Sequence, residues 1–111
     1  MEFTIKKENG INLLELSGNI MGGPESMKIN LDIHSLIENG ERKFIIDLTQ
    51  VNLMNSSGLG TLIASLSSIK KVGGILKIAS PNEKIKNLFI VTKLNTVFDL
   101  KNSVSDAIKD F

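Results

Sequence analysis

The apolar residues at the beginning of the chain form two short groups on either side of an Asn-Gly pair. Phe3 and Ile5 precede Asn9-Gly10. The group that follows consists of Ile11, Leu13, Leu14 and Leu16. An Asn-Gly pair readily adopts the positive φ angles of a tight hairpin turn. The pattern therefore predicts two antiparallel strands joined at residues 9 and 10.

A helical pattern follows the segment "SGNIMGGPE", which we interpret as a loop because Gly22, Gly23 and Pro24 interrupt it. Proline suits the first position of a helix, where its missing N–H would have no partner. The predicted helix runs from Pro24 to about Asn39, and Gly40 ends it. Its broad apolar face consists of Ile29, Ile33, Leu36 and Ile37, with Met27, Leu31 and His34 along one side.

The middle of the chain predicts a strand, a helix and a second strand. Lys43 to Leu48 is a nearly continuous apolar run, as expected for a strand covered on both faces. The following helix has apolar residues at helical spacing, with Lys70 and Lys71 in its last turn and Gly73-Gly74 at its end. These apolar residues are Leu59, Leu62, Ile63, Leu66 and Ile69. "GILKIA" repeats the buried-strand pattern.

The C-terminal third predicts two more helices around a short strand. "SPNE" (80–83) has the form of a capping box with Pro81 at the first helical position, and a short helix follows with Ile85, Leu88 and Phe89 inward. We expect a strand around Val97 and Phe98. The apolar face of a docked terminal helix is predicted at Val104, Ala107, Ile108 and Phe111.

This order of elements indicates an α/β fold. A hairpin followed by alternating strands and helices implies a mixed β-sheet, with the N-terminal hairpin and parallel strands, packed against about four helices. The sequence contains no linker or repeat. We therefore expect one domain over residues 1–111.

Composition excludes several functions. The net charge is +1, so electrostatics gives no reason to expect a direct nucleic-acid or membrane partner. There is no cysteine and only one histidine, His34, which we expect at the surface; no metal site or cofactor is predicted. No signal peptide is visible, and no apolar run approaches the ~18 residues of a membrane span. Cytoplasmic residence is expected.

The stretch "VNLMNSSGLGTLIASL" (51–66) is the candidate site. Asn55 and Ser56 are both good residues to cap the helix that follows. The stretch lacks the Gly-x-Ser-x-Gly of hydrolases, and its glycines fit neither the Walker nor the dinucleotide pattern. A Ser–His–acid site would need His34 beside a serine. We therefore expect no enzyme, but a hydroxyl at a helix N-terminus that an external kinase can reach.

These residues resemble the STAS domain, in particular the bacterial anti-sigma factor antagonists. The hallmark of that family is a strand ending in Asp-Leu, a spacer, and Asp-Ser-Ser/Thr-Gly-Leu-Gly at the start of a helix. The matching residues are Asp47, Leu48, Val51, Met54, Ser56, Ser57, Gly58, Leu59 and Gly60. The likeness continues through "IKKVGGILKIAS" and "NEKIKNLFIVTKL".

The resemblance implies a switch. The unphosphorylated domain would bind an anti-sigma factor that is also a serine kinase and thereby release a sigma factor. Phosphorylation of Ser56 would break that complex, and a serine phosphatase would reset it. The implied partner-binding residues are Met21, Gly22, Asn55, Ser56, Ser57, Gly58, Leu59 and Gly60, on a monomer or weak dimer.

Two departures and one alternative accompany the resemblance. Asn55 stands where the family has an acid, and "GNIMGGPES" replaces an Asp-containing segment that normally borders the partner-binding surface. The alternative is a stand-alone STAS module that senses a nucleotide, lipid or other small molecule.

Overall fold

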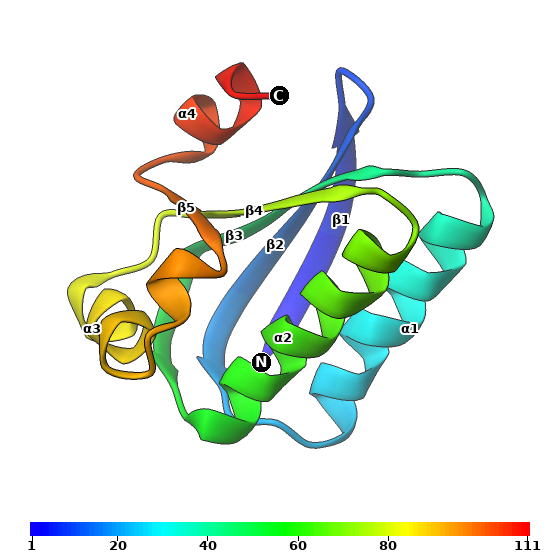
Figure 1. Ribbon diagram of the computed structural model, residues 1–111. Coiled ribbons are helices and arrows are strands. Elements are labelled where there is room, and N and C mark those ends of the chain that lie inside the picture. The colour runs from blue at the N-terminus through cyan, green and yellow to red at the C-terminus, as the bar shows by residue number, and fades with distance from the viewer.

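The computed structural model describes residues 1–111 and contains one five-stranded sheet (Figure 1). Its strands are β1 (Glu2–Glu8), β2 (Ile11–Ile20), β3 (Lys43–Met54), β4 (Ile75–Ala79) and β5 (Asp99–Lys101), and they lie in that order across the sheet. β1 pairs with β2 in antiparallel fashion, and all other pairs are parallel. The predicted mixed sheet is confirmed, and so is its hairpin, in which Asn9 and Gly10 have φ angles of 53° and 78°.

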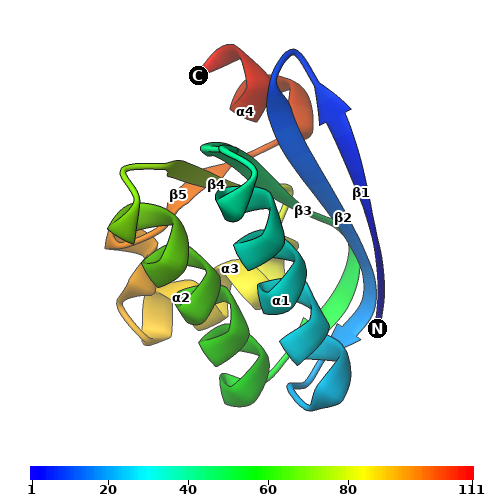
Figure 2. The same ribbon diagram turned by 90° about the vertical axis from the view of Figure 1, so that its right-hand side faces the viewer.

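The helices are α1 (Pro24–Glu38), α2 (Ser56–Lys71), α3 (Glu83–Val91) and α4 (Val104–Lys109), with a short 3₁₀ helix, η1 (Leu94–Thr96), after α3. Because β2 to β5 lie side by side in chain order, successive right-handed crossovers place their helices on the same face of the sheet. Figures 1 and 2 show α1 and α2 together on that face. No helix combines the length and the apolar content needed to cross a bilayer.

The sheet separates two apolar clusters of unequal size. The larger one lies between the sheet and the helices and includes Leu14, Ile46 and Leu62. Neighbouring strand residues point the other way, since side chains alternate along a strand. Of these, Ile11, Leu13, Ile45 and Ala79 form the smaller cluster together with Ala107 of α4. β2 and β3 are therefore covered on both faces, which explains their continuous apolar runs.

A buried lysine holds α4 against the smaller cluster. Lys77 lies on β4 with its side chain only 6% exposed, and its Nζ lies 2.6 Å from carboxylate oxygens of both Asp99 and Asp110. Lys101 Nζ lies 2.9 Å from Asp110 and 3.3 Å from Asp99, and the Phe111 ring lies 5.1 Å from Lys77 Nζ. Hydrogen bonds from Lys77 and Lys101 lower the pKa of Asp110 to about 2. Burial opposes the charge of Lys77, but the two carboxylates raise its pKa overall.

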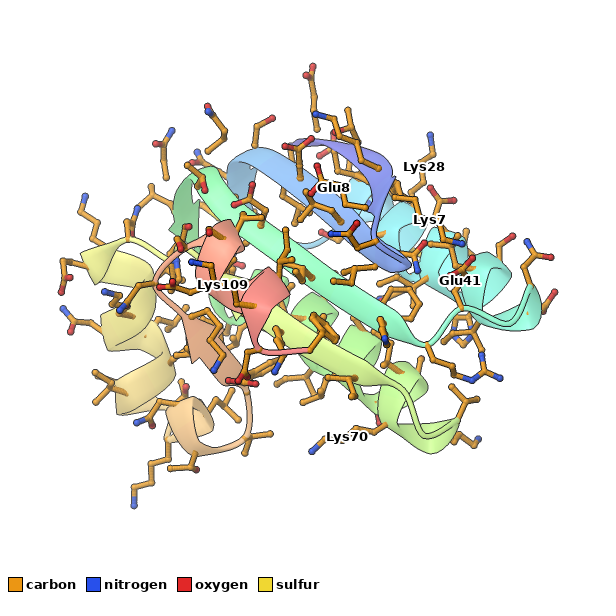
Figure 3. The ribbon with its side chains drawn as sticks, turned by 90° about the horizontal axis from the view of Figure 1, so that it is seen from above. Lys7, Glu8, Lys28, Glu41, Lys70 and Lys109 are labelled. Carbon is orange, nitrogen blue, oxygen red and sulfur yellow. The ribbon has the colours of Figure 1, made fainter.

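A second polar contact joins the hairpin to the chain after α1. Lys7 forms an ion pair with Glu41, and the two residues lie near one another in Figure 3. Asn12 Nδ2 donates to Glu41 at 3.0 Å and to the Lys43 carbonyl at 3.1 Å. The hydrogen bonds from Lys7 and Asn12 lower the pKa of Glu41.

Two predicted strand ends are wrong. β2 continues through Ser17 to Ile20, where we predicted a loop, and β3 continues from Leu48 to Met54. The added residues pair with one another, Gly18 with Val51 and Ile20 with Met54, across two register shifts. The polar and glycine residues at these ends adopt strand conformation because the backbones of β2 and β3 form hydrogen bonds with each other.

Three details of the C-terminal third also differ from the predictions. Asn82, rather than Ser80, caps α3, and its Oδ1 accepts from Ile85 N at 2.9 Å. Ser80 instead has a φ of 57°, and its N–H donates to the Lys101 carbonyl, so Pro81 precedes the helix. The last strand is Asp99–Lys101, whereas Phe98 is buried edge-on against Phe89, with ring centroids 5.3 Å apart.

Two helical faces are narrower than expected. Ile63 was predicted on the inner face of α2 but is exposed, while Leu59, Leu62, Leu66 and Ile69 are buried. On α1, Ile29 and Ile33 are buried, and Met27 and Leu31 are exposed.

Candidate functional site at the start of α2

The turn between β3 and α2 is built around Asn55. This residue is extended, with φ −103° and ψ −176°, and its Oδ1 accepts a hydrogen bond from Gly58 N at 2.8 Å. That bond satisfies one of the free N–H groups of the first helical turn. The Asn55 N–H in turn donates to the Ile20 carbonyl at 3.3 Å, so the cap is tied to the end of β2.

Ser56 and Ser57 are the first two residues of α2, and both are exposed. The Ser57 carbonyl accepts from Thr61 Oγ1 at 3.3 Å. No acidic residue lies in the first turn of α2, while Lys70 and Lys71 lie in its last turn. The helix N-terminus therefore keeps its partial positive charge without a carboxylate to offset it, a setting that favours an added phosphate.

Two glycines allow the loop after β2 to lie against this turn. A β-carbon on Gly58 would stand 1.9 Å from the Ile20 carbonyl oxygen, and one on Gly22 would stand 2.7 Å from Ser57 Cβ. Gly22 also has a φ of +84°, which disfavours other residues. The structure thus brings together two segments that the sequence separates by more than thirty residues.

The predicted partner-binding residues fall into two groups. Met21, Asn55, Ser56, Ser57 and Gly60 are exposed, and Gly22 is half-buried. Gly58 and Leu59 are buried, so they support the turn from within rather than presenting atoms to a partner. Sequence reasoning missed Ile20, whose carbonyl anchors the turn. The only signal for it is the adjoining Gly22-Gly23 pair, which indicates an unusual backbone path.

His34 lies far from Ser56. Its Nε2 is 3.2 Å from Ser68 Oγ, near the opposite end of α2. Twelve residues separate Ser56 from Ser68, roughly 18 Å along a helix that rises 1.5 Å per residue. Ser68 lies inside the helix, where backbone N–H groups are engaged in helical bonds and cannot form an oxyanion hole. The pair does not form the arrangement that hydrolysis at Ser56 would require.

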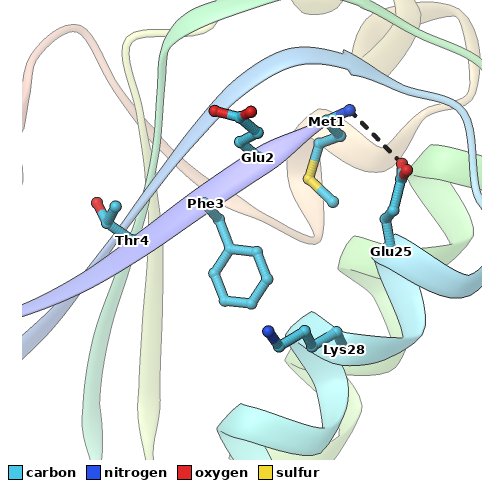
Figure 4. A pocket seen from close by; sticks show the side chains of 6 residues that line it. All are labelled: Met1, Glu2, Phe3, Thr4, Glu25 and Lys28. Carbon is cyan, nitrogen blue, oxygen red and sulfur yellow. Dashed lines mark ion pairs between the residues drawn. The ribbon is translucent and has the colours of Figure 1, made fainter.

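None of the five hollows of the surface is lined by the residues of the turn itself. One of about 410 Å³ lies between β1 and the start of α1, where the Met1 amino group is 3.5 Å from Glu25 and Phe3 lies near Lys28 (Figure 4). Another of about 540 Å³ is lined by Asn52, Leu53, Asn82, Glu83 and Lys84. Ser56 lines none of the hollows. The start of α2 is an exposed surface outside these hollows.

Comparison with known families identifies the fold. The family described as the STAS domain matches residues 2–107. This chain belongs to the STAS domain family. In this STAS domain, the capped turn and the exposed Ser56 lie within the motif that suggested the resemblance.

Two relatives share part of their sequence with this STAS domain. The Thermotoga neapolitana homolog of TM1081 is 27% identical over 74 residues, which cover 67% of this chain and 66% of that protein. The anti-sigma-B factor antagonist of Bacillus subtilis is 36% identical over 55 residues, half of each chain.

Solved structures share the fold over nearly the whole chain. TM1081 from Thermotoga maritima gives a TM-score of 0.88 at 22% identity, covering 97% of this chain and 92% of that one. The anti-sigma factor antagonist SpoIIAA in its unphosphorylated form gives 0.83 at 18% identity, covering 98% and 95%. The phosphorylated form of SpoIIAA from Bacillus gives 0.77 at the same identity, covering 98% of each chain.

Proposed function

We propose that this STAS domain is an anti-sigma factor antagonist, which binds an anti-sigma factor while unphosphorylated and so releases a sigma factor. The names of its relatives support this role. The observation that carries the proposal is the exposed Ser56 at the first position of α2, on a turn held by the Asn55 cap and the Gly58–Ile20 contact. Such a protein acts in the cytoplasm, where sigma factors work.

The proposed switch is phosphorylation of Ser56. The anti-sigma factor, acting as a serine kinase, would transfer the terminal phosphoryl group of ATP to Ser56 Oγ, releasing ADP and the hydroxyl proton. A serine phosphatase would hydrolyse the ester. Ser56 is proposed as the acceptor because it is the first serine of the motif, whereas Ser57 is its neighbour and lies beside Gly22. The chain itself supplies a substrate in this scheme and performs no catalysis.

The magnitude of each effect indicates where phosphorylation acts. A phosphate adds about −1.5 to −2 charges. Next to a helix N-terminus its interaction is favourable and contributes only ~0.3–2 kcal/mol. Inside a complementary interface the same group meets desolvation and like charges, at a cost of several kcal/mol, or on the order of 10³-fold in affinity. The phosphate should therefore block docking and leave the fold intact.

The test is phosphorylation by the native partner. The chain is captured from its own cells with whatever anti-sigma factor binds it, and the captured kinase is incubated with ATP and wild type, Ser56→Ala or Ser57→Ala. Mass spectrometry should find the phosphate on Ser56, and Ser56→Ala alone should abolish it. Label on Ser57, or on neither residue, would overturn the assignment.

The ligand-sensing alternative stays a prediction. The hollows of about 410 and 540 Å³ are the places where such a ligand would be sought.

A further inference from the structure

Two exposed apolar side chains lie one turn apart on α1. Met27 and Leu31 are each 65% exposed, and we call them the α1 ridge. Met21, in the loop before α1, is 47% exposed. Isolated exposed apolar residues are common on protein surfaces, but a group of them is typical of an interaction site. The packing of the domain therefore leaves the two side chains of the ridge in contact with solvent.

Hydrogen bonds show that the ridge borders α2. Met27, Leu31 and His34 follow one another at helical spacing, and His34 contacts Ser68 of α2. Asn30, beside the ridge, accepts from Ser65 Oγ of α2 at 2.6 Å. The side of α1 that carries the ridge is therefore the side next to α2.

The neighbouring strip of α2 is made of small residues. Steps of four and three residues back from Ser68 lead to Ala64, Thr61 and Ser57, which share one side of the helix. Ala64 and Ser57 are exposed, and Thr61 between them is buried, so the exposed part of the strip consists of the other side chains. The ridge thus lies beside a row of small side chains on α2, the small-residue strip, which ends at the Ser56–Ser57 turn.

The ridge and the turn form one continuous surface. Gly22 lies against Ser57, and the Gly23 carbonyl accepts from Met27 N at 3.2 Å. The N-terminal ends of α1 and α2 lie at the same end of the molecule, and the two helices run side by side (Figures 1 and 2). The loop that carries Met21 thus links the start of α2 to the ridge.

We propose that the α1 ridge and the small-residue strip of α2 are a docking surface for the anti-sigma factor, which covers them with apolar side chains while it holds Ser56. This inference rests on the proposed function. A stable interface covers about 800 Å² on each partner, far more than one helical turn offers, so the partner must extend over adjacent elements. The ridge carries the most exposed apolar side chains of the elements next to the turn, ahead of Met21, Ile63 and Leu53, and methionine adapts readily to a partner.

The test compares ridge variants with a matched exposed residue elsewhere. Met27→Ser and Leu31→Ser remove ridge side chains, and Val91→Ser removes a 79%-exposed side chain on α3. Titration calorimetry with the anti-sigma factor should show about tenfold weaker binding for each ridge variant and unchanged binding for Val91→Ser. In the kinase assay, the ridge variants should raise KM and retain kcat for Ser56.

Each outcome of these measurements either supports or overturns the docking surface. Wild-type affinity in both ridge variants would overturn the docking surface while the proposed function stands. If wild type itself neither binds nor becomes phosphorylated, the proposed function and the docking surface both fail. Analytical ultracentrifugation measures the oligomeric state of wild type and of the ridge variants. If wild type self-associates and the ridge variants do not, the surface binds a second copy of this chain, and the inference is wrong. Thermal unfolding of each variant verifies that it is folded.

Discussion

The Ile20 carbonyl and the Gly58 α-carbon are in such close contact that a β-carbon on Gly58 would stand 1.9 Å from the Ile20 oxygen. The same oxygen accepts a hydrogen bond from the Asn55 N–H at 3.3 Å. The end of β2 and the start of α2 are thus held together at the Ile20 oxygen, and the exposed Ser56 lies in the turn that this contact joins.

Gly58→Ala should destabilise the domain. The added methyl group would force β2 and α2 apart, at a cost of ~1–3 kcal/mol or more in the free energy of unfolding. Gly60→Ala is the matched control, because nothing lies within 4 Å of its β-carbon position and alanine favours a helix by up to ~1 kcal/mol. Urea unfolding should separate the two variants. Equal stability of both would contradict the contact.

Asn55→Asp should retain the cap and stabilise α2. The carboxylate can accept from Gly58 N as the amide does, and it adds ~0.3–1 kcal/mol at neutral pH by its interaction with the helix N-terminus. The gain should disappear in acid, where the carboxyl group is neutral. Asn55→Ala, which has no acceptor, should lose ~1 kcal/mol. Denaturant titrations at two pH values measure all three chains.

Phosphorylation of Ser56 should leave the domain folded. The phosphate lies next to free N–H groups with no acidic residue in the first turn, so the free energy of unfolding should change by less than ~2 kcal/mol. Thermal unfolding and amide exchange of the phosphorylated chain measure this. A loss of protection across α2 would instead indicate that the switch acts by unfolding.

Acid should weaken the attachment of α4. The pKa of Asp110 is lowered from 3.8 to about 2 in the folded chain. A lowered folded-state pKa means that the stabilisation is fully present above pH 3.8 and is lost as the pH falls toward 2. The lowered pKa of Asp99 acts in the same direction. The protection factors of amides 104–110, which are exchange rates divided into the intrinsic rates at the same pH, should therefore fall over this range.

Two variants check the origin of that acid effect. Asp110→Asn removes a carboxylate that pairs with Lys77 and Lys101, so its α4 should already exchange faster at neutral pH and respond less to acid. Asp106→Asn changes an exposed carboxylate on the same helix outside those ion pairs and should keep the wild-type acid response. Identical behaviour of the two variants would show that the Lys77 contacts do not hold α4.

The order of strands and helices could be predicted because each element has local causes. The Asn9-Gly10 turn, the cap before α2 and the cations at the end of α2 each act on residues only a few positions away. The errors occur where the cause is remote. Asn82 rather than Ser80 caps α3, because the Ser80 N–H and hydroxyl are turned to the carbonyls of Lys101 and Asn102, which lie far along the chain.

In the candidate site, too, the local features could be predicted from the sequence and the contacts between distant segments could not. The motif around Ser56 was visible in the sequence, and the family it indicates is confirmed. The contact of Gly22 with Ser57 was not visible, because two segments distant in sequence meet only in the folded chain. The exposure of Ile63 has a similar reason, since the spacing of apolar residues does not say how far the covering elements extend.

The sequence by itself determined the alternation of strands and helices, the hairpin and the family motif, because turn geometry, capping and helical spacing are local properties of the chain. Only the tertiary structure decided how far β2 and β3 extend, which apolar side chains of α1 stay exposed, and how Lys77 is paired under α4. These depend on hydrogen bonds, packing and ion pairs between segments that the chain brings together only when it folds.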